Sequence, residues 1–468
     1  MAWLGRTRRL HFVGIGGIGM SGIAELVANL GYEVSGSDAR RSDITDRLAG
    51  LGVRIDSGHN ASHVEGADVV VVSSAIAADN PELTEARRRH IPVIARAEML
   101  AELMRLRFGI AIAGAHGKTT TTSMVALMLE RAGLDPTAVI GGRLSVFGSN
   151  ARLGRGQYMV AEADESDRSF LKLSPSIALI TNIDREHLEA YGSFEALVAA
   201  FADFAGRVPF YGAVVACVDD GPVAAMLRKV ERRIITYGFA AHANVRGLAP
   251  QSDARGGRCG VRYSIAGLPG GDGEGELQLA VPGLHNLQNA LGAVAVGLEL
   301  GVPFERIAAA LAEFKGAERR YQVRGSAKGV TVVDDYGHHA TEIAAVLRGA
   351  RSGEPRRLVA VFQPHRYSRT RDLLADFGPA LALADVVFLT DIYPAGEAPI
   401  AGATLESLAT EVRRSVPELH VVPSLDRVPQ AVADQARDGD LVVTLGAGSI
   451  GHAGDRILQA LSSGGVHV

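Results

Sequence analysis

The chain has 468 residues, a formal net charge of −4 and 21% charged residues. This balance excludes the basic face that binding to a nucleic-acid backbone requires, and no apolar run approaches the roughly 20 residues that span a bilayer. The length favours three domains of about 150 residues each. Cys217 and Cys259 are isolated and lack metal-ligand spacing, which fits a reducing cytoplasm. We therefore expect a soluble, cytoplasmic protein, and the lack of a long apolar run predicts that it does not insert into a membrane.

Predicted strands and helices alternate in the first part of the chain. Apolar runs predict strands at residues 10–13, 33–35 and 68–73, and helical patterns occupy residues 19–29 and 96–106. Strands that alternate with helices are typical of βαβ units built on a parallel sheet. We therefore predict a Rossmann-like α/β domain over residues 1–107.

A glycine-rich segment, VGIGGIGMSGIAE at residues 13–25, joins the first predicted strand to the first helix. Its G-x-G-x-x-G pattern at Gly14, Gly16 and Gly19 lets a diphosphate rest on the helix N-terminus. Asp38 follows the next strand, near where a ribose-binding carboxylate would lie. A nicotinamide dinucleotide and a UDP derivative both satisfy this geometry. The same glycine pattern would also occur if the glycines served only to let the helix pack closely against the strand.

The middle of the chain opens with a predicted buried strand at residues 109–113, which runs into a second glycine loop. A helix is predicted at residues 119–132, with further strands at residues 158–161, 177–181 and 214–218. Residues 252–275 predict a surface loop or hairpin, and residues 286–300 predict a helix. On that helix Asn286 and Asn289 share one face, where they would bind adenine or ribose, or serve as a cap and a core polar contact. We predict a central P-loop ATPase-type α/β domain over residues 108–320.

The second loop reads GAHGKTTT, from Gly114 to Thr121. Between a strand and a helix, such a loop directs its N–H groups at phosphate oxygens, while Lys118 can reach the terminal phosphates and Thr119 can bind Mg²⁺. It is a short G-x-x-G-K-T form, because Ile112 occupies the place of the first glycine in the general pattern. We predict contacts with ATP from Gly114, Ala115, His116, Gly117, Lys118, Thr119 and Thr120.

Carboxylates and a histidine follow the next two predicted strands, in AEADESDRSF and TNIDREH; they are Glu162, Asp164, Glu165, Asp167 and His187. At the C-terminal ends of parallel strands such side chains face the ligand crevice, and oxygen ligands suit Mg²⁺. For any single carboxylate a solvated acidic loop is the simpler explanation. Glu162 stands in line with its strand, so we predict that it binds the metal together with His187.

The last part of the chain predicts a third, Rossmann-like α/β domain over residues 321–468, with strands at residues 329–334, 357–362, 386–390, 420–422 and 440–444. The first of these strands ends in DDYGHH and the second in FQPHRYSRT. Histidines and arginines at neighbouring strand ends would form a cationic pocket for a carboxylate. Arg319 and Arg320, just before this domain, would either close onto ATP phosphates or form a surface pair.

The chain resembles the Mur ligases in an ordered series of segments: VGIGGIGMSG, GAHGKTTT, EADESDRSFLKL, TNIDREH, HNLQNA, ERRYQ, DDYGHH, FQPHRYSRT and LGAGSIG. The series covers essentially the whole length and is far more specific than any one motif. The resemblance implies an N-terminal domain for a UDP moiety, a central ATPase domain and a C-terminal domain for an amino acid. It also implies ATP and Mg²⁺ as cofactors, UDP-N-acetylmuramate and L-alanine as substrates, and a monomer or homodimer.

The resemblance further implies roles for single residues. The implied catalytic residues are Lys118, Glu162, His187, Arg320 and His338, and the metal ligands are Thr119, Glu162 and His187. Four further contacts with ATP are implied at Asn286, Asn289, Arg320 and Asp335. The UDP-substrate site is implied at Gly14, Gly16, Gly17, Gly19, Ser37, Asp38, Ser73 and Ser74. The pocket for L-alanine and the lactyl end of the sugar is implied at Tyr336, His338, His365, Arg366 and Arg369.

Two features depart from the family pattern. Ala340 stands where a proline usually follows DDYGHH, which affects only the rigidity of the helix start. No lysine occurs between Lys172 and Lys229, whereas several sister ligases use a carbamylated lysine a short way beyond the metal histidine. This absence favours the alanine-adding branch of the family.

The expected reaction forms an amide through an acyl phosphate, with Mg²⁺ and Lys118 neutralising the developing charge. Three alternatives remain open: a recycling ligase that joins a tripeptide to the same nucleotide sugar, a nicotinamide oxidoreductase, and a non-catalytic nucleotide-binding protein. A small cationic pocket suits alanine better than a peptide. The oxidoreductase would leave the Gly114 loop unexplained, and the pairing of Glu162 with His187 argues against a protein without catalysis.

Overall fold

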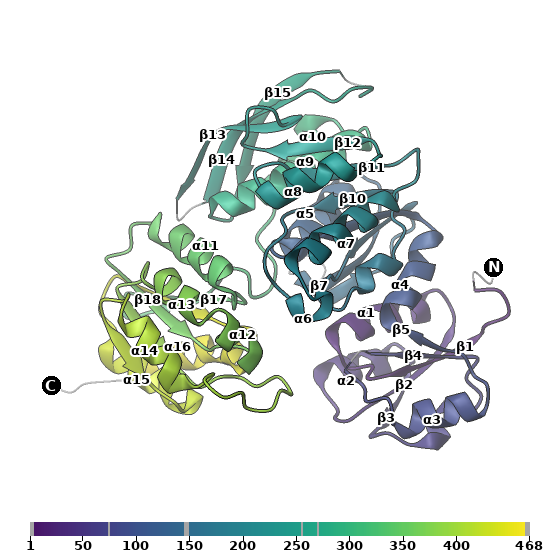
Figure 1. Cartoon of the computed structure of the whole chain (residues 1–468), viewed down its shortest axis with the longest axis horizontal. Helices are drawn as coiled ribbons and strands as arrows, with labels where there is room; N and C mark the ends of the chain where they lie inside the picture. Colours follow the sequence, from purple (N-terminus) through teal and green to yellow (C-terminus); the bar gives the residue numbers. More distant parts are fainter. Residues whose placement is uncertain (1–3, 74, 145–148, 254–255, 269–270, 464–468) are drawn as a thin grey trace. The chain divides into compact units, whose positions relative to one another are not determined.

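The computed structural model describes residues 4–73, 75–144, 149–253, 256–268 and 271–463, which form three β-sheets flanked by helices (Figure 1). This confirms the predicted α/β fold class with three parallel-sheet regions. The chain divides into two compact units: Met1–Leu248, Gly260–Leu277 and Gln288–Phe314 form the first, and Ala249–Cys259, Gln278–Leu287 and Lys315–Val468 form the second. Among the described residues, the helices are all too short or too polar to cross a bilayer.

The N-terminal sheet has the strand order β3-β2-β1-β4-β5, and all neighbouring strands are parallel. Its strands are β1 (Arg9–Val13), β2 (Glu33–Asp38), β3 (Arg54–Ser57), β4 (Val69–Val72) and β5 (Val93–Ala95). Its helices are α1 (Ile18–Asn29), α2 (Asp43–Gly50), η1 (Ala61–Val64), α3 (Pro81–Arg88) and α4 (Arg96–Arg105). In chain order, the strands β1, β2 and β3 extend toward one edge of the sheet, and β4 and β5 extend from β1 toward the other edge. Ligands bind at such a switch in strand order in open α/β sheets.

The central sheet has the order β15-β14-β13-β12-β11-β10-β6-β9-β7-β8 in the described residues. Neighbouring strands from β13 to β7 are parallel, and β7 and β8 are antiparallel. The strands are β6 (Phe108–Ala113), β7 (Thr137–Leu144), β8 (Ser149–Arg152), β9 (Tyr158–Glu162), β10 (Ile177–Ile180), β11 (Ala213–Cys217), β12 (Ile234–Gly238), β13 (Val245–Asp253), β14 (Gly256–Tyr263) and β15 (Gly273–Leu279). The segment predicted as a loop or hairpin therefore contributes strands to the edge of this sheet.

The helices that follow these strands are α5 (Lys118–Arg131), η2 (Ser169–Lys172), α6 (Leu188–Tyr191), α7 (Phe194–Gly206), α8 (Gly221–Met226), η3 (Leu227–Lys229), α9 (Leu284–Glu299) and α10 (Phe304–Ala312). Helix α5 is buried from Thr119 to Leu129. Strand β6 lies between β10 and β9, and all three are parallel. The loops that follow these three strands therefore meet at one edge of the sheet, at the N-terminus of α5.

The C-terminal sheet has the order β16-β17-β21-β18-β19-β20. Its strands are β16 (Gln322–Ala327), β17 (Val330–Asp335), β18 (Arg357–Phe362), β19 (Val386–Leu389), β20 (Leu419–Val421) and β21 (Asp440–Leu445). Its helices are α11 (Ala340–Arg351), α12 (Tyr367–Asp372), α13 (Leu374–Leu381), α14 (Leu405–Arg413), η4 (Leu425–Arg427), α15 (Val428–Gln435), η5 (Ser449–His452) and α16 (Ala453–Ser463).

Apolar cores cover both faces of this sheet. Val332 and Val333 are adjacent in β17 but belong to opposite cores, as the alternation of side chains along a strand requires. The edge strand β16 is antiparallel to β17 and carries a register shift between Val323 and Gly325. The sequence did not predict β16, because its residues are half-exposed and mostly not β-branched or aromatic.

Candidate active site

The loop from Gly114 to Gly117 turns the chain from β6 into α5. These two glycines have φ angles of +137° and +82°, which residues with a side chain rarely adopt. A Cβ atom on Gly114 would lie 2.0 Å from Thr181 Oγ1, and one on Gly117 would lie 2.6 Å from Asn289 Oδ1. Both positions therefore require glycine, and the loop leads into a helix N-terminus that favours phosphate.

Lys118 folds its side chain back over this loop. Its Nζ donates hydrogen bonds to Gly114 O at 2.6 Å, to Ala115 O at 3.1 Å and to Glu165 Oε1 at 2.8 Å. Burial alone would favour the neutral amine, but nearby carboxylates, first Glu165 and then Asp164, outweigh burial and raise the pKa of Lys118. A charged ammonium is therefore held against the phosphate loop.

Glu165 is the buried partner of this ammonium and is 2% exposed. Burial raises the pKa of Glu165 to about 7, although the Lys118 ammonium acts in the opposite direction. Only one carboxylate oxygen is paired with Lys118, since Oε2 is buried without a hydrogen-bond partner among the described residues. The sequence placed Glu165 in an acidic segment but did not predict this pairing.

The predicted metal ligands Thr119 and Glu162 lie together. Glu162 ends β9, and its Oε2 accepts a hydrogen bond from Thr119 Oγ1 at 3.0 Å. Neighbouring oxygen ligands of an octahedral Mg²⁺ ion lie about 3 Å apart. The two side chains therefore fit one Mg²⁺ ion at the start of α5.

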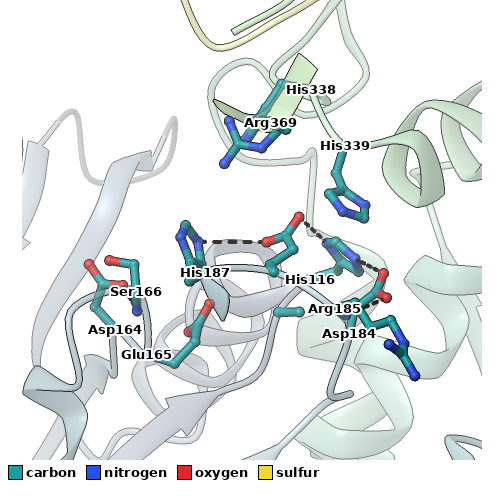
Figure 2. Close-up of polar contacts among 12 residues, drawn as sticks. His116, Asp164, Glu165, Ser166, Asp184, Arg185, His187, His338, His339 and Arg369 are labelled. Atoms are coloured by element: carbon teal, nitrogen blue, oxygen red, sulfur yellow. Dashed lines mark hydrogen bonds and ion pairs between the residues drawn. The ribbon is translucent and has the colours of Figure 1, made fainter. Parts of the chain in front are cut away.

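His116 ties the glycine loop to the segment that follows β10. Its backbone N–H donates to Asn182 Oδ1 at 2.8 Å, and its carbonyl accepts from Thr181 Oγ1 at 2.7 Å. Its ring Nε2 lies 2.8 Å from Asp184 Oδ2 (Figure 2), and the Ala115 N–H donates to Asn182 O at 3.1 Å. The sequence alone did not single out Asn182 or Asp184, although both lie in TNIDREH.

His187 lies just before α6 in a left-handed conformation, with a φ of 55°. Its Nε2 is 3.8 Å from Glu186 Oε2. Donor atoms of Glu165, Glu186 and His187 all lie within 4.8 Å of one another. The sequence predicted that Glu162 and His187 bind the metal together. In the structure, the carboxylates of Glu165 and Glu186 lie near the His187 ring.

The two predicted adenine-side asparagines lie on α9, and each is 8% exposed. The Asn289 amide lies against Gly117, as the close approach of Oδ1 to that glycine shows. Asn286 Nδ2 donates to Pro282 O at 2.6 Å and so holds the start of the helix. Thr120, also predicted to contact ATP, lies in the first turn of α5 and is 7% exposed.

In the second unit, Arg320 and Asp335 lie near the start of the C-terminal sheet. The Arg320 guanidinium lies 5.1 Å from the centroid of the Tyr336 ring, and its Nη1 is 3.7 Å from Glu342 Oε1. Asp335 ends β17 and accepts the Tyr321 N–H at 2.7 Å. Burial raises the pKa of Asp335 to about 6, with Arg320 acting against it.

The predicted amino-acid pocket also gathers within the second unit. The His338 ring centroid lies 5.5 Å from that of Tyr336 and 5.6 Å from that of His365. Arg369 Nη1 lies 3.2 Å from His365 Nδ1. Arg366 Nε is buried without a hydrogen-bond partner in the described part of the chain. An orphaned guanidinium N–H beside a second arginine fits a carboxylate ligand.

The hydrogen bonds of His338 define its tautomer. Its Nδ1 lies 3.0 Å from the Tyr336 carbonyl oxygen, which can only accept, so Nδ1 carries the proton and Nε2 carries the lone pair. Burial lowers the pKa of His338 to about 3, so the ring is neutral. The neighbouring His365 ring stacks on Tyr393, with centroids 5.5 Å apart. The sequence did not predict Tyr393, which lies far along the chain from the other pocket residues.

The glycine turn of the N-terminal sheet is held by Asp38. Gly14 has a φ of +80°, and the Gly16 N–H donates to Asp38 Oδ2 at 2.9 Å. Gly17 is the N-cap of α1, and Gly19 follows in the first turn of this helix. The turn and the helix N-terminus therefore have the geometry of a diphosphate site.

The serines predicted for the same site differ in their placement. Ser73 follows β4 beside the turn, since a Cβ on Gly14 would lie 3.4 Å from Ser73 Cβ. Ser74 lies outside the described residues. Ser37 is 0% exposed and its hydroxyl donates to Glu82 Oε2 at 2.8 Å.

Glu82, in α3, is a fully buried carboxylate that the sequence did not indicate. Its Oε2 lies 2.7 Å from His11 Nε2, and its Oε1 lies 2.9 Å from His59 Nδ1. Burial alone would raise the pKa of Glu82, but hydrogen bonds from His11, Ser37 and His59 outweigh burial and lower the pKa to about 2. Ser37 thus supports a buried polar cluster beneath the end of β2.

Three models of one family match successive parts of the chain. The model described as "Mur ligase family, catalytic domain" matches residues 9–108, "Mur ligase middle domain" matches residues 112–297, and "Mur ligase, glutamate ligase domain" matches residues 319–448. Together these matches extend over most of the three sheets.

Individual proteins match along nearly the whole length. A UDP-N-acetylmuramate–L-alanine ligase of Geotalea daltonii is 53% identical, covering 98% of this chain and 99% of that protein. A UDP-N-acetylmuramate–L-alanine ligase of Anaeromyxobacter dehalogenans is 54% identical, and the match covers 97% of this chain and 98% of that protein. The crystal structure of the UDP-N-acetylmuramate-alanine ligase of Thermotoga maritima has a TM-score of 0.81 and 29% identity, covering 97% and 99%. The crystal structure of a murein peptide ligase of Psychrobacter arcticus has a TM-score of 0.72 and 26% identity, and the match covers 97% of this chain and 99% of that chain. The chain belongs to the Mur ligase family.

Proposed function

We propose that this chain is an ATP-dependent ligase that joins L-alanine to the lactyl carboxylate of UDP-N-acetylmuramate, in peptidoglycan precursor synthesis. The observation that carries the proposal is the charged Lys118 on a phosphate loop beside the Thr119–Glu162 oxygen pair. The choice of substrates is supported by the 53% and 54% identity to L-alanine ligases along nearly the whole chain.

The first step activates the carboxylate. A lactyl carboxylate oxygen attacks the γ-phosphorus of ATP, the bond to ADP breaks, and an acyl phosphate forms. Lys118 neutralises charge that develops on the transferred phosphoryl group, and N–H groups of the loop orient the phosphates. Thr119 and Glu162 would hold Mg²⁺, which would supply positive charge to the phosphates of ATP.

The second step forms the amide. The amine of L-alanine attacks the acyl carbonyl carbon, the bond to phosphate breaks, and the amine loses a proton. His338 carries its lone pair on Nε2, so this atom can accept that proton, although the lowered pKa makes the ring a weaker base than a free imidazole. Arg366 and Arg369 would bind the alanine carboxylate, which orients the amine.

A ligase that adds a peptide to the same nucleotide sugar is the nearest alternative, because the fold is shared with a murein peptide ligase. The higher identity to the alanine ligases favours the single amino acid. Steady-state phosphate release by the purified chain separates the two. With ATP, Mg²⁺ and UDP-N-acetylmuramate we expect release with L-alanine and none with the tripeptide; release with the tripeptide alone would contradict the proposal.

Lys118→Ala is predicted to lower turnover by a factor of about 10²–10³, because one electrostatic stabiliser of the transferred phosphoryl group is lost. The fold should survive, since Glu165 can take up a proton once its cation is gone: burial already raises its pKa to about 7. Arg131→Ala, which removes the exposed ion pair with Glu313, is the matched control and should turn over normally. Near-normal phosphate release by Lys118→Ala would refute the role of this lysine.

A further inference from the structure

The start of helix α12 is held by a segment that follows β19, residues 393–397. We propose that Glu397 is a positioning residue for the amino-acid pocket, which acts by holding Ser368 at the start of α12. The helix start in turn directs Arg366 and Arg369 at the carboxylate of the amino acid. The inference rests on the proposed function, because it assigns to the pocket for L-alanine a residue that acts through its neighbours.

The Glu397 carboxylate caps α12 from outside the helix. Its Oε2 accepts the Ser368 N–H at 3.0 Å, and its Oε1 accepts from Ser368 Oγ at 2.6 Å. The first N–H groups of a helix lack partners within the helix and need an acceptor. The N-cap residue is Arg366, whose guanidinium can only donate, so the acceptor must come from another part of the chain. Glu397 provides it.

Glu397 also leaves Arg366 available for a ligand. Burial alone would raise the pKa of Glu397, but hydrogen bonds from Ser368, and then the charge of Arg366, outweigh burial and lower the pKa. Both carboxylate oxygens are used by Ser368, and Arg366 Nε is buried without a hydrogen-bond partner in the described part of the chain. Glu397 therefore offsets the charge of Arg366 before a ligand binds, and that N–H remains for a carboxylate.

The backbone on both sides of this contact has unusual conformations. Arg366 has a φ of 72° and a ψ of 141°, and Ala395 has a φ of 49°, which are rare for residues with a Cβ atom. Such conformations persist only where the surrounding contacts determine them. The Arg366 N–H donates to Tyr393 O at 2.8 Å, and the Tyr393 N–H donates to Pro364 O at 2.8 Å. This pairing supports the strained backbone at Arg366.

Arg369 depends on the same helix start. Its Nη1 donates to His365 O at 3.1 Å and lies 3.2 Å from His365 Nδ1. Since a guanidinium only donates, His365 Nδ1 is the acceptor and Nε2 carries the proton. The His365 ring stacks on that of Tyr393, with an angle of 14° between the ring planes. A shift of α12 relative to residues 393–397 would therefore move Arg366 and Arg369 together.

Steady-state kinetics of the full chain test this role. Glu397→Ala should lower kcat/KM for L-alanine about tenfold, close to the effect of one lost hydrogen bond to a charged group, mainly through a higher KM for L-alanine. The KM for ATP should keep its wild-type value. Glu397→Gln should recover part of the loss, because an amide can still pair with Ser368. Glu406→Ala removes an exposed carboxylate from α14 and is the matched control, with wild-type KM values expected.

A double-mutant cycle tests whether Glu397 acts through Ser368. Ser368→Ala removes one of the two hydrogen bonds, so the losses in kcat/KM of Glu397→Ala and Ser368→Ala should not multiply in the double variant. Hydrogen exchange gives a readout that needs no substrate. Glu397→Ala should speed exchange of the amides at the start of α12 and leave those of α14 unchanged.

A wild-type KM for L-alanine in Glu397→Ala would overturn the positioning role, because a purely structural contact changes the amount of active protein and not this KM. Losses that multiply in the double variant, or unchanged exchange at the start of α12, would show that Glu397 does not act by holding Ser368. Circular dichroism checks that each variant is folded, and if Glu397→Ala is unfolded, Glu397→Gln and Ser368→Ala carry the test.

The proposed function fails in a different way. A wild-type chain without alanine-dependent phosphate release would contradict the function, while hydrogen exchange at α12 would still show whether Glu397 holds the helix. Alanine-dependent release by the wild type, with the same KM for L-alanine in Glu397→Ala, would contradict only the role of Glu397.

Discussion

Glu82 and Glu85 lie on the same helix, α3, and the pKa of each carboxyl is lowered to about 2. The physical settings differ. Glu82 is fully buried among histidines and Ser37, whereas Glu85 forms ion pairs with Arg88 and Arg89 at the surface. Solvent screens the surface pairs, so equal shifts in pKa do not imply equal contributions to stability.

Glu82→Gln is predicted to lower the free energy of unfolding at pH 7 by roughly 3 kcal/mol, the linkage value of a shift from 4.5 to about 2 in a buried group. Because the folded pKa lies below the unfolded one, this stabilisation is present above pH 4.5 and is lost as the pH falls towards 2. Glu85→Gln, the matched control, should remain near wild-type stability. Urea unfolding from pH 7 down to pH 3 measures both. Equal losses in the two variants, or a Glu82→Gln loss that does not shrink in acid, would disprove the assignment.

Single residues were predictable where they share a short segment. Lys118 and Thr119 were predicted from one strand–loop–helix pattern, and the structure adds a hydrogen bond from Thr119 Oγ1 to Glu162 Oε2 that this pattern does not contain. The partners of Glu82 were not predictable, because His11 is 71 positions away and nothing local marks the pair. Pairing across the fold depends on register and packing, which one sequence does not reveal.

Elements were predicted best where local signals agree. Strand β6, the glycine loop and α5 lie within one residue of their predicted bounds, because a buried apolar run, two glycines and a helical pattern follow one another. Strand β2 extends to Asp38, beyond the predicted end at residue 35, because Ser37 pairs with Val13 in β1. The polar residues at the end of β2 predict a loop from the sequence alone, because the pairing with β1 that makes them a strand is not visible in the sequence.

Helix α5 permits a test with two glycines, Gly114 in the loop before its start and Gly133 just after its end. Gly114→Ala and Gly133→Ala both place a side chain at positive φ, +137° and +79°. At Gly133 nothing lies within 4 Å of the new Cβ, so only backbone strain of about 1–2 kcal/mol is expected. At Gly114 the Cβ would meet Thr181 Oγ1 at 2.0 Å, and that hydroxyl is held by its hydrogen bond to His116 O.

Gly114→Ala should therefore lose nucleotide binding, while Gly133→Ala should bind ADP as the wild type does. Isothermal titration with ADP measures the affinities, and thermal unfolding measures the accompanying losses in stability. The loop must shift to accept the methyl group, which moves the N–H groups that face the phosphates. Wild-type ADP affinity in Gly114→Ala would show that this loop does not bind the nucleotide.

At the scale of the whole molecule, one apolar core extends from the N-terminal sheet to the central sheet, and the C-terminal sheet has two cores of its own. We propose that the domain boundaries lie at residues 107/108 and 320/321, between the last helix or strand of one sheet region and the first of the next. The length of the chain suggested three domains, and the pattern of strands suggested three sheets. The two compact units follow a different division, because segments near β13, β14 and the start of α9 group with the C-terminal sheet.

This division predicts how the whole chain unfolds. The cores of the two units are separate, which favours more than one transition in calorimetry, since a chain of several domains rarely unfolds in a single two-state step. A non-hydrolysable ATP analogue at about 100 times its dissociation constant should stabilise the unit that contains the Gly114 loop by about 2.7 kcal/mol, and raise the temperature of that transition. Lys118→Ala should lose most of this shift, because the analogue binds it less tightly. A single transition that moves as one with the analogue would instead mean that the nucleotide stabilises both units together, and the units would then not be independent in stability.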